Sequence, residues 1–355
     1  MADDQPLPAD HPLVDGRTGD SRLIRAYRGD RPEVTPVWFM RQAGRSLPEY
    51  RDLRVGVDML DACLDPALSS EITLQPVRRH GVDAGIFFSD IVVPLKLAGV
   101  DVDIVPGRGP VLGAPIATAA DVAALAPLDP AALAPVADGV ARTVAHLDGT
   151  PLIGFAGAPF TLAAYLVEGG PSKDHLRART LMHSEPETWA ALMEWAADVT
   201  GAFLRAQVVA GTSAAQLFDS WAGSLSLADY TKHVAPWSAR ALSHVSDLGV
   251  PIVHFGVGTG ELLAAMLDVG ADVMGIDDRI PLDDGIRRLG ARVPVQGNIN
   301  PAVLGAPWPV LEAHVRDIVE RGRAAPAHVV NLGHGVPPET DPAVLTRIVE
   351  LVHSI

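Results

Sequence analysis

The sequence predicts an α/β protein of one domain, a (β/α)8 (TIM) barrel, from three observations. Eight short apolar runs are continuous rather than alternating, as in parallel strands buried on both faces. Stretches with apolar residues at three-to-four spacing, typical of amphipathic helices, separate these runs. No linker, repeat or low-complexity segment divides the 355 residues. An open doubly wound sheet is the alternative, because a strand count does not show whether a sheet closes.

The first part of the chain divides into a terminal segment and the start of the barrel domain. Residues 1–20 are rich in Asp and Pro, and we expect them to form a flexible segment. The barrel domain is then expected over 21–355. Residues 21–28 predict a short helix, because Ser21 is a suitable N-cap and the apolar residues that follow fall on one side.

The strands and helices of the barrel follow in alternation. The expected strands are 35–40, 83–89, 151–156, 214–218, 251–255, 272–276, 293–297 and 328–332. The clearest helix is 186–210, and shorter ones are expected at 261–269, 283–289 and 310–321. The stretch 92–150 is the irregular part, where we expect an extra hairpin before two Ala-rich helices.

Composition excludes several classes of protein. The 28 Lys and Arg residues against 43 Asp and Glu give a net charge of −15, which argues against a nucleic-acid partner. The single cysteine, Cys63, excludes an intrachain disulfide and any site that needs several thiolates. No apolar run reaches the roughly 18 residues of a membrane span, and the start of the sequence does not resemble a signal peptide. We therefore expect a cytoplasmic protein without a membrane partner.

The residues after the first strand form a cationic candidate site, because barrel enzymes carry their active sites at the carboxyl ends of the strands. This stretch is Arg41, Gln42, Ala43, Gly44 and Arg45. A helical turn would place both arginines on one face, where two guanidinium groups suit a substrate with several carboxylates or phosphates. Gly44 would let a ligand approach the backbone closely. The alternative is an ordinary solvated helix face.

Four further side chains follow other expected strands. Asp90 ends the run IFFSD and is predicted to place a carboxylate at the floor of an apolar cup, although it is also a candidate helix cap. Tyr165 is either a core aromatic or a ligand contact. Ser220 has no Gly-x-Ser-x-Gly element around it, which favours hydrogen bonding over nucleophilic attack. His334, between two glycines, is either structural or in contact with a ligand.

Metal and cofactor signals are weak. The sequence has no His-Glu-x-x-His element, so we expect no metal site. No lysine follows an expected strand, which disfavours Schiff-base chemistry. The stretch 256–260 opens an expected helix with three glycines, but it lacks the spacing of a dinucleotide fingerprint.

Five motifs together resemble the uroporphyrinogen decarboxylase family. They are PVWFMRQAGRSLPEYR (36–51), FSDI (88–91), GFAGAPFTLAAYLVEGG (154–170), QLFDSWAG (216–223) and NLGHGV (331–336). The resemblance implies a single distorted (β/α)8 barrel that works as a homodimer and needs neither metal nor organic cofactor. It also implies that the four acetate side chains of uroporphyrinogen III become methyl groups, giving coproporphyrinogen III on the way to haem.

The resemblance also assigns roles to the candidate residues. Arg41 and Arg45, with the three residues between them, would bind substrate carboxylates, and Arg41 would also orient the departing one. Asp90 would accept hydrogen bonds from the pyrrole N–H groups and stabilise the cationic pyrrole intermediate. The remaining substrate contacts implied are Tyr165, Ser220 and His334. Ser46 and Trp221 stand at positions that vary among relatives.

Two rival functions fit parts of the same pattern. One is a methyltransferase of the same superfamily, which uses a thiolate zinc site to activate a thiol acceptor. In this sequence His254-Phe255-Gly256 stands where a His-x-Cys element would be sought, and Cys63 lies far earlier. The other rival is a protein that binds an anion or a tetrapyrrole without catalysis. The combination of arginines, carboxylate, tyrosine and histidine argues against it.

Overall fold

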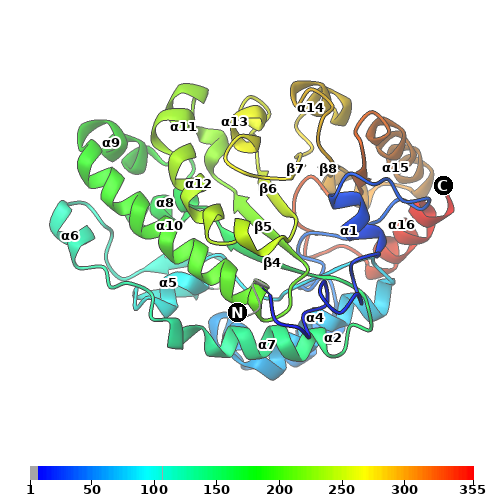
Figure 1. Cartoon of the computed structure of the whole chain (residues 1–355), viewed down its shortest axis with the longest axis horizontal. Helices are drawn as coiled ribbons and strands as arrows, with labels where there is room; N and C mark the ends of the chain where they lie inside the picture. Colours follow the sequence, from blue (N-terminus) through cyan, green and yellow to red (C-terminus); the bar gives the residue numbers. More distant parts are fainter. Residues whose placement is uncertain (1–6, 106) are drawn as a thin grey trace, which may run out of the picture.

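A curled parallel sheet forms the centre of the protein, which a computed structural model describes over residues 7–105 and 107–355 (Figure 1). Its spatial order is β1 (Gly85–Ile86), β4 (Leu152–Gly157), β5 (Ala214–Asp219), β6 (Ile252–Gly256), β7 (Val273–Gly275), β8 (Val295–Gln296) and β9 (His328–Val329). Every neighbouring pair is parallel, and spatial order follows chain order, as in a barrel. The predicted barrel fold is confirmed, with seven strands in place of eight.

The eighth position is taken by residues 36–40, here called the closing segment, whose first residues join the two edges of the sheet. Val37 forms an isolated parallel bridge with Val330, whose N–H donates to the carbonyl of Pro36 at 2.8 Å. On the other side, the N–H of Asp83, just before β1, donates to the carbonyl of Val37 at 2.9 Å. The prediction of a full strand at 35–40 is therefore wrong, although its place in the barrel is right.

In the last part of this segment, side chains take the place of the backbone hydrogen bonds between strands. The N–H of Phe39 donates to Oε1 of Gln42 at 3.0 Å, and the N–H of Met40 donates to Oδ1 of Asn331 at 2.9 Å. Pro36 has no N–H to donate at the start of the segment. The backbone is thus satisfied without regular pairing, which explains why a run of strand-forming residues does not form a strand here.

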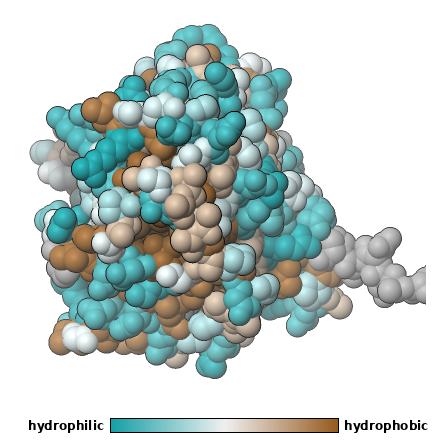
Figure 2. All heavy atoms as spheres, turned by 90° about the vertical axis from the view of Figure 1, so that its left-hand side faces the viewer, coloured by the Kyte–Doolittle hydropathy of each residue, from teal (hydrophilic) through white to brown (hydrophobic). Residues whose placement is uncertain are grey.

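Sixteen α-helices surround the sheet in the described part of the chain (Figure 1). They are α1 (Arg22–Tyr27), α2 (Pro48–Leu53), α3 (Met59–Leu64), α4 (Pro66–His80), α5 (Val93–Leu97), α6 (Ala119–Ala123), α7 (Ala134–Val144), α8 (Pro159–Glu168), α9 (Leu176–Ser184), α10 (Pro186–Val209), α11 (Leu227–His233), α12 (Ala235–Ser243), α13 (Leu263–Leu267), α14 (Leu282–Arg288), α15 (Trp308–Gly322) and α16 (Pro342–Ser354). Figure 2 shows the face on the left of Figure 1, where hydrophilic and hydrophobic residues are mixed. Among the described residues, no helix combines the length and the apolar character needed to cross a bilayer.

Several predicted elements are confirmed. Helix α1 begins after Ser21, whose side chain accepts the N–H of Ile24. The extra hairpin is the antiparallel pair β2 (Val102–Val105) and β3 (Gly109–Leu112). Helix α10 matches the long amphipathic stretch and buries its apolar face against β4, α8 and α12.

A polar network crosses the inside of the barrel. Tyr27 donates its hydroxyl to Oε1 of Gln296 at 2.5 Å, and Nε1 of Trp38 donates to the same oxygen at 3.2 Å. Nε2 of Gln296 then donates to Oε1 of Gln216 at 3.2 Å. Because these side chains come from α1, the closing segment, β8 and β5, they show which face of each strand points inward.

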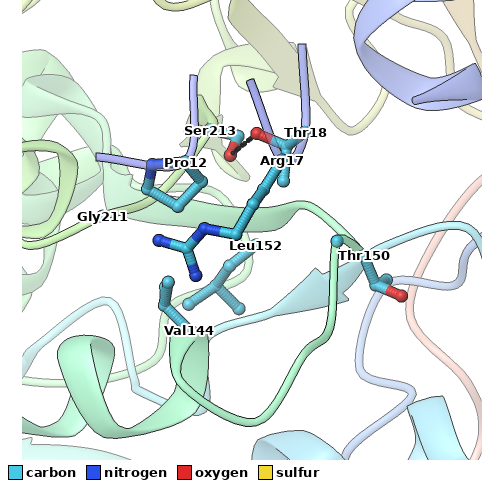
Figure 3. A pocket seen from close by; sticks show the side chains of 9 residues that line it. Pro12, Arg17, Thr18, Val144, Thr150, Leu152, Gly211 and Ser213 are labelled. Carbon is cyan, nitrogen blue, oxygen red and sulfur yellow. Dashed lines mark hydrogen bonds between the residues drawn. The ribbon is translucent and has the colours of Figure 1, made fainter. Parts of the chain in front are cut away.

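The described part of the N-terminal segment covers the amino ends of the strands. The first six residues of the predicted flexible segment lie outside the described residues. Nε2 of His11 lies 3.0 Å from the carbonyl oxygen of Val208, and the hydroxyls of Thr18 and Ser213 lie 2.8 Å apart. The pocket in Figure 3 lies at this end, between Thr18, Ser213 and Leu152. Its volume of about 10 Å³ holds one water at most, so it is not a substrate site.

Candidate active site

Three phenylalanines form an apolar layer inside the barrel, next to the polar network that contains Gln216 and Gln296. Gln216 points inward, and therefore so does Phe218, two residues later in β5. Phe155 is the register partner of Gln216, and Phe255 is the partner of Phe218, so both share the inward face. The ring of Phe218 lies edge-on to the rings of Phe155 and Phe255, with centroids at 5.3 Å and 5.8 Å.

Asp90 lies just beyond the carboxyl end of β1, which ends at Ile86. Ile86 pairs with Ile153, which shares a face with Phe155. The half-buried Asp90 accepts the N–H of Val92 on Oδ1 at 3.1 Å. Burial raises the pKa of Asp90, while this N–H and the charge of Arg41 oppose the increase. A carboxylate at the floor of an apolar cup stays a prediction, and the contact with Val92 shows that Asp90 also shapes the turn before α5.

The loop that follows the closing segment is not helical, so the prediction of a helical turn from Arg41 to Arg45 is wrong. Residues 41–47 form turns, and the first helix after them is α2, which begins at Pro48. Arg41 has a left-handed backbone with φ of 61°. At Gly44 a Cβ would lie 3.1 Å from the carbonyl oxygen of Arg41, so this glycine serves the tight turn itself.

Gln42 supports this loop from within the protein. Its side chain is fully buried, its Oε1 accepts the N–H of Phe39, and its Nε2 donates to the carbonyl of Ala84 at 3.0 Å. The structure therefore places Gln42 as a brace that holds Arg41, while Ala43 is half-buried beside it. Sequence reasoning missed the matching brace, Asn331, although it is the first residue of the NLGHGV motif.

Arg41 connects the other candidate residues through its charge. Burial and Asp90 raise the pKa of Tyr165 to about 12, and Arg41 opposes that increase. At the exposed His334, desolvation by the surrounding protein lowers the pKa, and Arg41 and Arg279 lower it further against Asp278. The charge of Arg41 therefore acts on Asp90, Tyr165 and His334.

The side chain of Arg41 packs against Gly335, in the loop that follows β9. A Cβ at Gly335 would collide with the side chain of Arg41. Arg45 lies farther along the same loop, where burial raises the pKa of Tyr50 and the charges of Arg54 and Arg45 oppose the increase. The side chain of Arg45 is exposed.

The arginines of this loop are free of acidic partners. Neither Arg41 nor Arg45 forms a salt bridge with any residue in 7–105 or 107–355. Glu49, the acidic residue of α2, is instead paired with Arg79 at 2.7 Å. Both Arg41 and Arg45 are exposed, so their guanidinium groups are available for carboxylates of a bound molecule.

An aromatic stack holds Tyr165 in place. The ring of Trp221 lies against that of Tyr165 with centroids 3.9 Å apart. The ring of His175 also lies against Trp221, with centroids 4.3 Å apart and the two planes tilted by 32°. The backbone of Trp221 is held in turn, because its backbone N–H donates to the hydroxyl of Thr161 at 3.3 Å. Ser220, half-buried, precedes Trp221 at the end of β5. Sequence reasoning missed His175, because only the folded chain brings it to Trp221.

The glycine-rich loop 256–260 has a structural partner. The N–H of Gly258 donates to Oδ2 of Asp277 at 2.6 Å, so the anion held by this loop is a side chain of the protein. Arg279 lies beside the same carboxylate, with Nε 3.7 Å from Oδ2, and remains largely exposed. Arg279 is a second cation near His334 that the sequence pattern did not single out.

The residues considered for a thiolate zinc site lie apart from this site. The side chain of His254 faces the helix layer, where its Nδ1 lies 3.0 Å from the carbonyl oxygen of Met266. Cys63 is buried in α3, and burial raises the pKa of its thiol well above the usual range. These residues do not fit a metal-activated thiol at the carboxyl ends of the strands.

Comparisons with known proteins agree with the fold and the motifs. A solved structure of a methyltransferase from Methanosarcina mazei has a TM-score of 0.79 at 18% identity, covering 95% of this chain and 98% of its own. A B12-independent methionine synthase from Shewanella sp. W3-18-1 has a TM-score of 0.54 at 11% identity, covering 80% of this chain and 86% of its own. At these identities the likeness shows a shared fold alone.

Sequence relatives are much closer. Proteins named uroporphyrinogen decarboxylase from Leifsonia xyli subsp. xyli and Arthrobacter sp. (strain FB24) are each 70% identical to this chain. The alignments cover 97% and 96% of this chain and 97% and 99% of the relatives. The family model described as "Uroporphyrinogen decarboxylase (URO-D)" matches residues 18–355. The chain belongs to the uroporphyrinogen decarboxylase family.

Proposed function

We propose that this protein is a carboxy-lyase that converts the four acetate side chains of uroporphyrinogen III to methyl groups, yielding coproporphyrinogen III in haem biosynthesis. Its family membership supports the reaction. The observation that carries the assignment to this site is the half-buried carboxylate of Asp90, which feels the charge of Arg41, an arginine without a salt bridge among the described residues. The reaction proceeds on the protein's own residues, without an added metal or organic cofactor.

Asp90 stabilises the positive charge that the reaction needs. Loss of CO2 from an acetate arm leaves an electron pair, and a protonated pyrrole ring accepts it. The carbon–carbon bond to the carboxyl group breaks, its electron pair moves toward the ring, and a proton added at the methylene carbon completes the methyl group. Each conversion therefore consumes one proton and releases one CO2. The carboxylate of Asp90 accepts hydrogen bonds from the pyrrole N–H groups and pairs with the cationic ring.

The remaining residues bind and orient the substrate. Arg41 holds the carboxylate that departs, and Arg45 binds a second carboxylate nearer the outside. Gln42, Ala43 and Gly44 keep the loop in the shape that presents these arginines. The hydroxyl of Tyr165, the hydroxyl of Ser220 and the imidazole of His334 contact acetate or propionate groups. The phenylalanine layer excludes water beneath the ring, which strengthens the pairing with Asp90.

Product analysis tests this function directly. The purified protein is incubated anaerobically with uroporphyrinogen III, and products are separated by their number of carboxyl groups. We expect a series from heptacarboxylate to tetracarboxylate. Substrate binding without any product would favour the non-catalytic tetrapyrrole-binding alternative, and it would contradict the proposal.

We also propose that the protein works as a homodimer, which the family resemblance implies. Light scattering coupled to gel filtration measures the mass in solution. A mass of twice the 37.4 kDa chain is expected, and a monomeric mass at assay concentration would contradict it.

A further inference from the structure

Two imidazoles and one carboxylate meet on the surface, apart from the candidate active site. His183 comes from α9, and Asp229 and His233 come from α11. One ligand atom from each residue lies within 4.8 Å of the others. Nε2 of His183 is 3.4 Å from Oδ1 of Asp229, and the two histidine rings stand nearly edge-on with centroids 5.6 Å apart.

The backbone that carries these side chains is held on two sides. Asp229 and His233 are four residues apart on α11, so they share one face of the helix. The side chain of Ser226 caps α11 by accepting the N–H of Asp229 at 3.1 Å. At the other end, Nε1 of Trp189 donates to the carbonyl of His233 at 3.1 Å, which ties α10 to α11. The side chain of His183 keeps the freedom of a largely exposed group.

We propose that His183, Asp229 and His233 bind one divalent transition-metal ion of the zinc class. Imidazole nitrogens at 2.0–2.1 Å and a carboxylate oxygen at a similar distance would place the donors about 3.3 Å apart in a tetrahedral site. Oδ1 of Asp229 and Nε2 of His183 already have this separation, and the ligand atom of the half-buried His233 lies within 4.8 Å of the ligand atoms of the other two residues. Water takes the fourth position.

The donor set selects the class of ion. Two nitrogens and one oxygen suit Zn²⁺, Cu²⁺ or Ni²⁺, whereas Mg²⁺ and Ca²⁺ prefer sites made of oxygen alone. A bound ion would join α9 to α11 and so stabilise the folded state in proportion to its occupancy. None of the three ligands belongs to the candidate active site, so this site does not rest on the proposed decarboxylase function.

Titration calorimetry with zinc chloride tests the site on the full chain after removal of any histidine tag. We expect one Zn²⁺ per chain, an unfolding temperature that rises with Zn²⁺, and no binding of Mg²⁺. His183→Ala, Asp229→Asn and His233→Ala each weaken Zn²⁺ binding by about tenfold or more. His146→Ala, at an exposed histidine on the surface outside the cluster, leaves the affinity unchanged.

Two results would overturn the proposal. One is a wild-type protein that binds no Zn²⁺ at concentrations well above those of the protein. The other is an affinity that stays the same in the three ligand variants, because the ion would then bind elsewhere. His183 is exposed at the end of α9, so His183→Ala retains the fold and carries the test even if a variant in α11 unfolds.

Discussion

The ionised form of Asp90 is destabilised by burial and stabilised by neighbouring groups. Burial raises the pKa of this carboxyl group, and only the N–H of Val92 and the charge of Arg41 oppose the increase within the protein. Such a carboxylate gains more from a cation at close range than a fully hydrated one does, because the surrounding protein screens the interaction weakly. A protonated pyrrole is that cation, so the proposed pairing favours the charged intermediate over the neutral substrate.

The substitution Asp90→Asn tests this role, since the amide keeps the size of the side chain and loses its charge. We expect kcat to fall by about 100-fold or more, as for the loss of a group that stabilises charge in the transition state, while KM changes little. Steady-state kinetics with uroporphyrinogen III measure both. Asp103→Asn, at an exposed position on the β2–β3 hairpin, is the matched control. A near-normal kcat in Asp90→Asn would refute the role.

Arg41→Gln should change the pH dependence of activity. Asp90 acts as a carboxylate, and its raised pKa places the loss of activity on the acid side at a higher pH than for an ordinary aspartate. Arg41 opposes this increase and also lowers the pKa of His334, so its removal raises both values. The acid limb of kcat/KM therefore moves to higher pH in Arg41→Gln. An unmoved limb, or the same shift in the hairpin variant Arg108→Gln, would contradict the coupling.

At this scale the sequence predicts position better than conformation. The place of Asp90 beyond the carboxyl end of β1 follows from the sequence, because this residue ends the apolar run IFFSD. The left-handed backbone of Arg41 does not follow, because it depends on Gln42 and Gly44 holding a turn that three-to-four spacing hides. The contact of His175 with Trp221 is equally invisible, because their separation in the chain is long.

Among the elements, the closing segment depends on one carboxylate. Oδ2 of Asp83 accepts the N–H of Val37 at 2.8 Å and lies 2.7 Å from Nε2 of His353 in α16. Nη1 of Arg22, in α1, lies 3.5 Å from the other oxygen. Asp83 thus connects two helices to the seam of the barrel, by which we mean the closing segment between β1 and β9. Regular strand pairing at the seam is limited to the bridge between Val37 and Val330.

Asp83→Ala should destabilise the protein through this seam. The variant leaves the N–H of Val37 without a partner, at a cost of about 1–3 kcal/mol in the free energy of unfolding. Urea unfolding followed by circular dichroism measures the change as a lower midpoint. Asp20→Ala removes an exposed carboxylate of the N-terminal segment and should leave the midpoint unchanged. Equal midpoints for wild type and Asp83→Ala would show that the seam does not depend on this residue.

The aromatic stack links β5 to α8 and should matter for the position of Tyr165. Each aromatic pair contributes about 0.5–1.5 kcal/mol, so Trp221→Leu should lower kcat/KM by roughly tenfold through a misplaced Tyr165. Trp221→Phe keeps a ring and should recover most of the loss. A merely structural role would lower the unfolding temperature in both variants without separating their kinetics, and that outcome would contradict the proposed positioning.

The order of elements follows from the sequence, whereas the seam does not. Continuous apolar runs predict parallel strands because both faces of such strands are buried, and spatial order then follows chain order in a barrel. The run 35–40 has the same composition, but its backbone is satisfied by the side chains of Gln42 and Asn331. Composition does not show which partner a backbone N–H finds.

For the whole molecule, the charge is distributed unevenly between the surface and the site. The chain carries a net charge of −15, and many of its arginines are paired with acidic residues on the outside. In the described part of the chain, Arg41 and Arg45 are outside these pairs, and the largely exposed Arg279, next to Asp277, is a second cation near His334. The site thus holds arginines without salt bridges within an acidic protein, which a global charge does not reveal.

The dependence of substrate binding on salt distinguishes the local charge from the global one. Screening acts over about 8 Å at physiological ionic strength and about 3 Å at 1 M, so added salt weakens contacts between arginine and carboxylate at the exposed rim. If the local arginines dominate, KM for uroporphyrinogen III rises with sodium chloride concentration. If repulsion by the net charge of −15 dominates, KM falls instead, which would contradict the carboxylate-binding role of this loop. Arg45→Gln removes the outer cation and should flatten the salt dependence, whereas Arg108→Gln on the distant hairpin should leave it unchanged.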